Sequence, residues 1–392
     1  MQQAYDVVIA GGGVVGSSVA YWLAADPDFD GSVLVVEPDP TYGACATTRS
    51  WGGLRQQFSH PDNIRMSMFG IEFARRAAEV LAVDGEGPDL GFHENGYLFL
   101  ASADGLPILQ QNVETQKSLG CEVELMSPDT LAARFPWINP DGLAAGCFGP
   151  RNEGWIDPHA LLQGFRRKAI SLGATYVKDA VVDVARDGAR VSGVSLRDGG
   201  DVACGVLVNA AGPRAGDIAR FAGTELPVRP RKRMTYVFDC REDLSSAPLT
   251  IDTNGVTFRP ESGQYLGIVS PPEDQDPDCD DLELEYDVFE ETIWPTLAHR
   301  VPAFEAIKLS SAWAGHYDFN TFDHNAILGP HPEIGGLMFC NGFSGHGIQQ
   351  SPAAGRAVAE LIAHGAYRSL DLTVFAYDRI PANRPVREAN IV

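Results

Sequence analysis

The chain has 392 residues, of which 44% are hydrophobic and 21% are charged, so it is a globular chain long enough for one large domain or two ordinary ones. Its 52 acidic and 30 basic residues give a net charge of -22, which disfavours nonspecific binding to nucleic acid or to anionic membranes. The 7 cysteines are odd in number and form no C-x-x-C pair, so a disulfide framework and a zinc site are both disfavoured and a cytoplasmic location is expected.

The apolar N-terminus lacks the pattern of a targeting signal. No basic region precedes the apolar run, Asp6 stands just before it, and no later stretch of about 18 apolar residues could span a bilayer. We therefore expect neither an export signal nor a transmembrane segment.

The N-terminal region alternates between strand and helix patterns. Residues 5–10 form a β-branched run suited to a buried parallel strand, residues 14–24 have helical spacing, and residues 32–38 form a second strand. Strand, helix and strand in this order predict a βαβ unit.

Helix and strand patterns continue along the chain. A helix is expected over 63–81 and a strand over 96–102. The next helix is expected to begin after Asp157, which we interpret as its N-cap, and to end just before Gly173.

A hairpin follows that helix. Strands are expected over 174–186 and 190–198, joined by the turn residues Asp187 and Gly188. A further buried strand, 206–210, ends in small residues before a short helix.

The segment from 229 to 315 has a different pattern, typical of an antiparallel sheet with one helix near 285–299. Its acidic run, 271–287, is interpreted as a solvated loop and not as a binding motif. A final strand at 336–341 and a helix at 351–365 resemble the N-terminal unit again, so two interleaved domains are expected. The antiparallel strands are expected at 233–239, 255–260, 264–270 and 310–315.

A glycine motif follows the first strand. Gly11, Gly13 and Gly16 have the G-x-G-x-x-G spacing, in which the glycines allow a tight turn, a close approach of a pyrophosphate and close helix–strand packing. Glu37 ends the second strand, where it can accept a hydrogen bond from a ribose hydroxyl. No arginine follows it directly, so a 2′-phosphate is disfavoured and NAD and FAD remain. The loop after Glu37 is rich in Thr, Ser and Gly, which favours FAD because such a loop can surround a second phosphate and a flavin ring.

Three motifs, "VVIAGGGVVGSSVAYWLA", "VNAAGPRA" and "GFSGHGI", make the chain similar to the FAD-dependent amine and D-amino-acid oxidoreductases of the glycine oxidase and sarcosine oxidase group. Together with the elements above, the resemblance implies an α/β plus α+β fold. A Rossmann-like FAD-binding domain of the glutathione-reductase type (1–82, 150–225 and 318–392) is interleaved with an antiparallel-sheet substrate domain (83–149 and 226–317). The FAD-binding residues that the motifs and the resemblance imply are Gly11, Gly13, Val14, Val15, Gly16, Glu37, Pro38, Thr47, Thr48, Arg49, Ser50, Gly52, Gly53, Leu54, Val182, Ala210, Ala211, Gly212, Gly345, His346, Gly347, Ile348 and Gln349.

The chain departs from that group at three positions. Gly315 aligns with the cysteine to which monomeric sarcosine oxidases attach FAD, so noncovalent FAD is expected. Tyr265 aligns with their oxygen-activating lysine and Gln349 with their lysine for the substrate carboxylate. A dehydrogenase with an electron acceptor other than O2 is therefore as compatible with the sequence as an oxidase.

Five residues are candidates for the substrate pocket. Arg55 and Arg259 could each pair with a carboxylate, or could form structural ion pairs. His316 and Tyr317 stand where related amino-acid oxidases carry a carboxylate-binding arginine, and His346 lies in the glycine-rich C-terminal loop.

The leading functional hypothesis is oxidation of a carboxylate-bearing amine, a secondary, N-methyl or D-amino acid, by hydride transfer to flavin N5, followed by hydrolysis of the imine. Two alternatives stay open. One is a 2-hydroxy acid dehydrogenase on the same fold, and the other is a non-catalytic flavoprotein that acts as an assembly factor.

Overall fold

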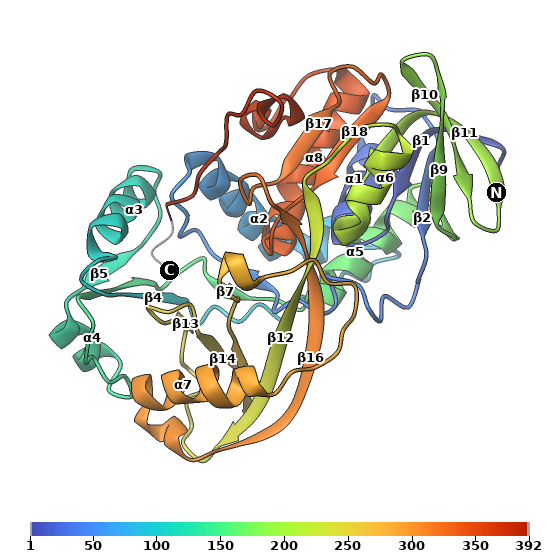
Figure 1. The fold of residues 1–392 in the computed structure, drawn as a ribbon. Coiled ribbons are helices and arrows are strands. Elements are labelled where there is room, and N and C mark those ends of the chain that lie inside the picture. The colour runs from blue at the N-terminus through green and yellow to red at the C-terminus, as the bar shows by residue number, and fades with distance from the viewer. Residues whose placement is uncertain (1, 390–392) are drawn as a thin grey trace.

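The computed structural model describes residues 2–389 and contains two large sheets and one small one (Figure 1). The first sheet has the order β17-β18-β11-β1-β2-β8, with β10 paired to β11 and β9 paired to β10. From β18 to β8 its strands pair in parallel, whereas β17, β10 and β9 join antiparallel. The strands are β1 (Ala4–Ala10), β2 (Val33–Glu37), β8 (Thr175–Lys178), β9 (Val181–Asp187), β10 (Arg190–Leu196), β11 (Gly200–Asn209), β17 (Ile327–Pro330) and β18 (Leu337–Asn341).

Both faces of this sheet are covered, as expected for parallel strands. Val7 and Ile9 of β1 pack against helices, whereas Val8 and Ala10 pack on the opposite face against α6 and the β9–β10 hairpin. This alternation explains the continuous apolar run at the N-terminus. The helices on the first face are α1 (Val14–Ala25), α2 (Pro61–Val80), α5 (Pro158–Ser171) and α8 (Gly347–His364), and α6 spans Ala215–Phe221.

Two local expectations can be compared directly with this part of the fold. The N-cap prediction is confirmed, because the carboxylate of Asp157 accepts hydrogen bonds from the backbone N–H groups of His159 and Ala160. The single strand expected over 174–186 is wrong, because it is divided into β8 and β9. The break occurs at Asp179 and Ala180, where the carboxylate of Asp179 accepts from the backbone N–H groups of Ala180 and Asp198.

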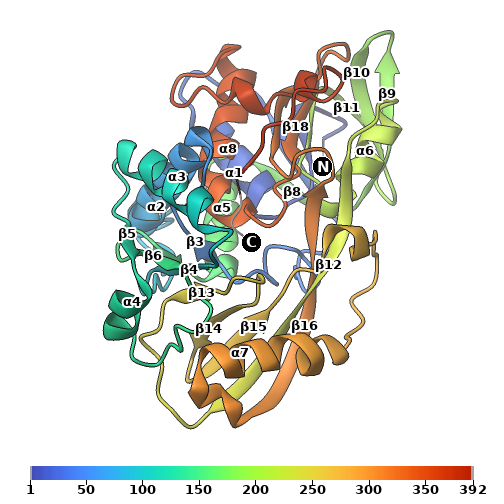
Figure 2. The ribbon, with the colours of Figure 1, turned by 60° about the vertical axis from the view of Figure 1, so that its left-hand side comes forward.

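The second sheet has the order β16-β12-β15-β14-β13-β4-β6-β5 and is antiparallel except for the β13–β4 pair (Figure 2). A helical segment, the π-helical turn Phe289–Ile293 followed by α7 (Trp294–Arg300), covers its outer face. The helices α3 (Leu106–Ser118) and α4 (Pro128–Arg134) were not expected from the sequence. The strands are β4 (Tyr97–Ala101), β5 (Glu124–Met126), β6 (Ala145–Gly149), β12 (Val228–Cys240), β13 (Leu249–Ile251), β14 (Thr257–Glu261), β15 (Gln264–Ile268) and β16 (Ile307–Asn320).

Long strands connect the two halves of the molecule. β12 and β16 pair from Val228 and Asn320 at one end to Cys240 and Ile307 at the other, and they extend from the second sheet toward the first (Figure 1). The small sheet, β3 (Gly53–Leu54) with β7 (Gly154–Trp155), joins the segment before α2 to the segment before α5. Within residues 2–389, no helix combines the length and the apolar character that crossing a membrane requires.

Candidate flavin and substrate cavity

A cavity of about 1360 Å³ lies where the C-terminal ends of the parallel strands face the second sheet. Ala10, Val36 and Ala210 line it from the first sheet, and Phe99 and Ile268 line it from the second. Ligands of open α/β sheets bind at this edge, and typical small-molecule sites enclose only about 300–1,000 Å³. The cavity therefore has room for a large cofactor together with a second molecule.

The glycine motif forms one end of this cavity. Gly11 has φ +99, and a Cβ atom there would lie 2.4 Å from the carbonyl oxygen of Ala210. A Cβ atom on Gly16 would lie 2.0 Å from the carbonyl oxygen of Gly11, so Gly16 allows close packing and does not itself line the cavity. Gly11 and Gly13 do line it, directly before α1, whose first N–H groups have no partner within the helix.

The polar groups at this end suit a dinucleotide. Glu37 accepts from the backbone N–H groups of Gly12 at 2.8 Å and of Asp39 at 2.9 Å, one on each carboxylate oxygen. Burial raises the pKa of Glu37, although these two hydrogen bonds act to lower it. Each oxygen can accept a further hydrogen bond, so ribose hydroxyls fit here.

The remaining expected residues of this end also face the cavity. The hydroxyl of Thr47 accepts from the backbone N–H of Val14 at 3.2 Å, which ties the loop after Glu37 to the start of α1. The others that line the cavity are Val15, Pro38, Val182, Ala211 and Gly212.

Residues 47–54, the predicted flavin loop, are anchored to β16. Arg49 donates through Nη1 to the carbonyl of Ala314 at 2.9 Å, and Trp313 donates through Nε1 to the carbonyl of Arg49 at 3.1 Å. Thr47, Arg49, Ser50 and Gly53 line the cavity.

Three expected residues of this loop do not line the cavity. The hydroxyl of Thr48 donates to backbone carbonyls of its own loop, and Leu54 is buried. At Gly52 a Cβ atom would lie 1.9 Å from the carbonyl oxygen of Ile156. These residues therefore pack on the side of the loop that faces away from the cavity. The structure does not support direct contact between them and a cofactor.

The glycine-rich C-terminal loop forms the opposite wall. All of Gly345, His346, Gly347, Ile348 and Gln349 line the cavity. Gly345 has φ +98, and a Cβ atom on it would lie 2.6 Å from the ring of Tyr317. The glycine thus lets the loop pass directly beside an aromatic ring of β16.

Asp318 holds the start of this C-terminal loop in place. Its carboxylate accepts from the backbone N–H of Phe343 at 3.1 Å, and its backbone carbonyl accepts from the N–H of Ser344 at 3.1 Å. Burial raises the pKa of Asp318 to about 6.

The two loops meet at Arg55. The backbone N–H of Arg55 donates to Oε1 of Gln349 at 2.8 Å, and Nη2 of Arg55 lies 3.1 Å from Nε2 of His346. Burial, followed by the charge of Arg55, lowers the pKa of His346 to about 3, so the imidazole is neutral and its Nε2 accepts from the guanidinium.

Arg55 lines the cavity beside the predicted flavin loop, next to two aromatic rings. The guanidinium carbon lies 4.6 Å from the ring centre of Phe58 and 5.2 Å from that of Phe99. Its Nε is buried and has no hydrogen-bond partner, and no carboxylate within residues 2–389 forms an ion pair with it. A partly buried cation without an acidic partner is suited to an anionic ligand.

Glu153, which the sequence did not single out, supports the segment after Arg55. Its Oε1 accepts from the backbone N–H groups of Gln56 at 2.7 Å and Gln57 at 3.1 Å, and Oε2 accepts from Nε2 of Gln57 at 2.7 Å. The side chain is buried beside Gly149, and burial raises its pKa to about 8. A single glutamate between two loops has no spacing pattern that could have revealed this role.

His316 and Tyr317 line the cavity, as expected for pocket residues. Nε2 of His316 donates to the carbonyl of Asp281 at 2.9 Å, and burial lowers the pKa of His316, so it is a neutral donor that already has a partner. Burial raises the pKa of Tyr317, over whose ring the Arg233 guanidinium lies at 5.1 Å.

Arg259, a candidate for the substrate pocket or for a structural ion pair, does not line the cavity, and neither does Tyr265. Arg259 lies beneath Trp51, donates to its carbonyl at 3.1 Å and forms an ion pair with Glu261. These contacts support a structural ion pair for Arg259 and not a role in binding a substrate carboxylate. Tyr265 lies on the opposite face of β15 from Ile268, in the core, where its hydroxyl donates to the carbonyl of Glu242.

The acidic run 271–287 is mostly exposed, as expected for a solvated loop, but it also makes contacts that the sequence did not predict. It is held against β12 by ion pairs, including a buried bidentate pair between Arg233 and Asp276 with distances of 2.8 and 2.7 Å. Pro271, Glu273 and Leu282 line the cavity. The run thus forms part of the cavity wall, because its negative charges neutralise the basic residues of β12.

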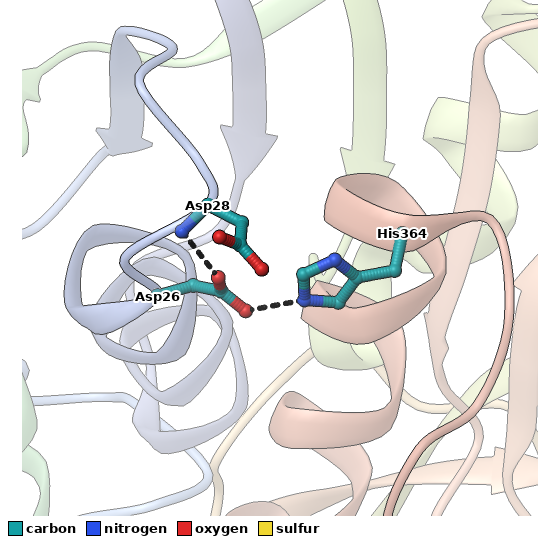
Figure 3. Close-up of side chains that lie close together, drawn as sticks. All are labelled: Asp26, Asp28 and His364. Carbon is teal, nitrogen blue, oxygen red and sulfur yellow. Dashed lines mark hydrogen bonds and ion pairs between the residues drawn. The ribbon is translucent and has the colours of Figure 1, made fainter.

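A separate group of polar side chains joins the ends of α1 and α8 (Figure 3). The carboxylate of Asp26 accepts from the backbone N–H of Asp28 at 3.0 Å and is hydrogen-bonded to Nε2 of His364 at 2.7 Å. Both Asp26 oxygens are thus used within the protein, so we assign these contacts to helix packing.

Comparison with known proteins agrees with this geometry. The model of the FAD dependent oxidoreductase family matches residues 6–361. The Xenopus laevis protein named FAD-dependent oxidoreductase domain-containing protein 1 is 44% identical over 99% of this chain and 85% of its own length. The mitochondrial sarcosine dehydrogenase of Mus musculus is 27% identical over 98% of this chain and 42% of its own length. The crystal structure of L-proline dehydrogenase from P. horikoshii has a TM-score of 0.85 and 25% identity, covering 98% of this chain and 100% of that one.

Proposed function

The chain belongs to the FAD dependent oxidoreductase (DAO) family, and we propose that it holds FAD noncovalently and oxidises a carboxylate-bearing amine, a secondary, N-methyl or D-amino acid. The observation that carries this proposal is the guanidinium of Arg55. It lines the cavity beside the predicted flavin loop, and no carboxylate within residues 2–389 forms an ion pair with it. A substrate carboxylate would supply the missing negative charge.

The residues of the cavity fit FAD. The backbone of Gly11 and Gly13, which line the cavity, and the carboxylate of Glu37 would hold the ADP half. The loop that contains Arg49 would hold the second phosphate and ribityl chain, and residues 345–349 would face the flavin ring from the start of α8.

Noncovalent binding is supported by the thiols of the cavity. Cys45 and Cys340 line it, and burial raises the pKa of both. A thiol with a raised pKa is a poor nucleophile at neutral pH, and Gly315 stands at the position that carries the attachment cysteine in monomeric sarcosine oxidases. Acid precipitation should therefore leave a colourless pellet and release all of the FAD into solution.

FAD, when bound, supplies a two-electron acceptor. The protein's own contribution is positional, because His346 is neutral and already accepts from Arg55. Arg55 would bind the carboxylate and thereby fix the carbon next to the nitrogen. An amine whose nitrogen is uncharged needs no protein base for its oxidation, which agrees with a cavity that holds neutral imidazoles.

Two relatives support an amine over a hydroxy acid. Sarcosine and proline, named for the Mus musculus and P. horikoshii proteins, are both secondary amino acids. The test is anaerobic reduction of the bound flavin by matched amino acids, N-methyl amino acids and 2-hydroxy acids. Reduction by hydroxy acids alone would support the dehydrogenase alternative. Bound FAD that no compound reduces would support a non-catalytic flavoprotein. Admission of air afterwards would distinguish an oxidase from a dehydrogenase with another electron acceptor.

A further inference from the structure

One face of the second sheet forms an apolar floor for the cavity. Phe99 of β4 pairs with Ile251 of β13, Ile251 pairs with Thr257 of β14, and Thr257 pairs with Ile268 of β15. All four side chains line the cavity. Because paired residues of neighbouring strands project from the same face, these four side chains form one continuous row. The strands that carry them are neighbours in the second sheet (Figure 2). We call these four residues the apolar row.

The apolar row begins at the unpaired cation. The guanidinium of Arg55 lies 5.2 Å from the ring centre of Phe99, the first residue of the row. The last residue, Ile268, is only partly buried and precedes Val269 and Ser270, which also line the cavity. Strands in a sheet are about 4.8 Å apart, so the row extends roughly 14 Å from Phe99 to Ile268.

The apolar row offers a ligand little hydrogen bonding. The hydroxyl of Thr257 donates to the carbonyl of Gly255 at 3.1 Å, which leaves its methyl group as the simplest contact for a ligand. The nearby hydroxyl of Thr235 is already bonded to Nε1 of Trp51 at 2.9 Å. A polar substituent along the row would thus lose hydration without a partner, whereas an apolar one would be stabilised by burial.

We propose that the substrate carries an extended apolar substituent that lies along the apolar row while its carboxylate binds Arg55. This inference rests on the proposed function and names its substrate class. The preferred substrates are amino acids with a long hydrocarbon or aromatic group, and not compounds as small as N-methylglycine.

Binding of straight-chain carboxylates to the FAD-loaded protein tests the apolar row without any turnover. Acetate, butyrate, hexanoate and octanoate contain the carboxylate but no amine, and isothermal titration calorimetry gives the Kd of each. The affinity should rise about three- to fourfold for each added methylene. Equal Kd values for acetate and octanoate would overturn the proposal, and so would equally tight binding of n-octylamine, which cannot pair with Arg55.

A variant at the end of the apolar row tests whether only the longer chains reach β15. Ile268→Asn should weaken octanoate by tenfold or more and leave butyrate unchanged, because only the longer chain reaches β15. Ile108→Asn, which replaces an isoleucine that is 36% exposed and outside the cavity lining, is the matched control and should leave every Kd unchanged. Equal weakening of butyrate and octanoate by Ile268→Asn would contradict the proposal. If that variant does not fold, the Kd values of the four carboxylates for the wild-type protein still test the proposal.

Amine oxidation and binding along the apolar row can be refuted independently of each other. Length-dependent carboxylate binding without flavin reduction by any amine would leave the apolar row intact and refute amine oxidation. Rapid flavin reduction by N-methylglycine, with no gain in affinity from acetate to octanoate, would support amine oxidation and refute the apolar row.

Discussion

Nη2 of Arg55 donates to Nε2 of His346 over 3.1 Å, which joins the loop after the dinucleotide motif to the glycine-rich loop before α8. The contact requires a neutral imidazole, and burial together with the Arg55 charge lowers the pKa of His346 to about 3. One charge, on arginine, therefore remains at the junction of the two loops. This is the charge that we propose a substrate carboxylate neutralises.

Removing that charge should weaken anionic ligands specifically. Arg55→Met is expected to raise the Kd of butyrate on the order of 30- to 1,000-fold, the usual loss when one partner of a buried charge pair is truncated. The FAD content should stay unchanged. Titration calorimetry and the visible spectrum measure the two quantities.

Two further variants control for that result. Arg55→Lys should recover only part of the affinity, because lysine lacks the planar, bidentate donor geometry of arginine. Arg76→Met, at an exposed arginine of α2, should have no effect. An Arg55→Met protein that binds butyrate normally would exclude Arg55 as the carboxylate site.

A methyl group at Gly11 should prevent FAD binding. In Gly11→Ala the new Cβ atom would lie 2.4 Å from the backbone oxygen of Ala210, so the turn before α1 must shift. We expect purified protein with little or no flavin, measured as the ratio of visible to ultraviolet absorbance.

Gly120→Ala separates backbone strain from this steric effect. Gly120 has φ +89, but a Cβ atom there meets nothing within 4 Å. This variant should lose on the order of 1 kcal/mol of stability and keep its full FAD content. Equal FAD loss in both alanine variants would contradict the assigned role of Gly11.

Glu153 should make the stability of the protein fall as the pH rises. Burial raises the pKa of its carboxyl group to about 8, whereas an unfolded glutamate has a pKa of about 4.3. The folded state thus holds the proton more tightly. The stabilisation is fully present below the unfolded value and is lost, by up to about 1.4 kcal/mol per pH unit, as the pH rises toward 8.

Urea unfolding of Glu153→Gln at several pH values between 5 and 8 tests this linkage. The stability of the wild type relative to the variant should decrease steadily with pH. Glu122→Gln, at an exposed glutamate, should parallel the wild type throughout. A Glu153→Gln curve that also parallels the wild type would show that Glu153 does not carry a raised pKa.

The buried ion pair beneath the acidic run should matter more than its exposed neighbours. Arg233 and Asp276 are each 5% exposed, so Asp276→Ala leaves a buried guanidinium unpaired and should cost about 3–5 kcal/mol. Asp278→Ala removes an aspartate that is 54% exposed from its pair with Arg231 and should cost less than about 1 kcal/mol. Chemical unfolding of both variants measures the difference, and equal costs would contradict the account.

The N-terminal βαβ unit could be predicted from the sequence because its residue pattern follows from steric contacts between neighbouring elements of the chain. The spacing of Gly11 and Gly16 reflects contacts of one turn with its own helix and strand, and the Asp157 cap is equally local. The roles of residues 345–349 came from resemblance to a family, and the structure adds their contacts with Tyr317 and Arg55.

Long-range contacts were not predictable. The Glu153 carboxylate bonds backbone groups nearly a hundred positions away, and the charges of the acidic run pair with β12. Arg259 lies on the same side of its strand as Thr257, yet Trp51 covers it, which no pattern within the strand could show.

The most direct test of the central claim is anaerobic stopped-flow reduction of the bound flavin by two compounds with the same long apolar side chain. One is an N-methyl amino acid and the other is the corresponding 2-hydroxy acid. The N-methyl amino acid should bleach the flavin completely, the hydroxy acid should leave it oxidised, and Arg55→Met should slow the bleaching at low substrate concentration. Bleaching by the hydroxy acid and not by the N-methyl amino acid would refute amine oxidation.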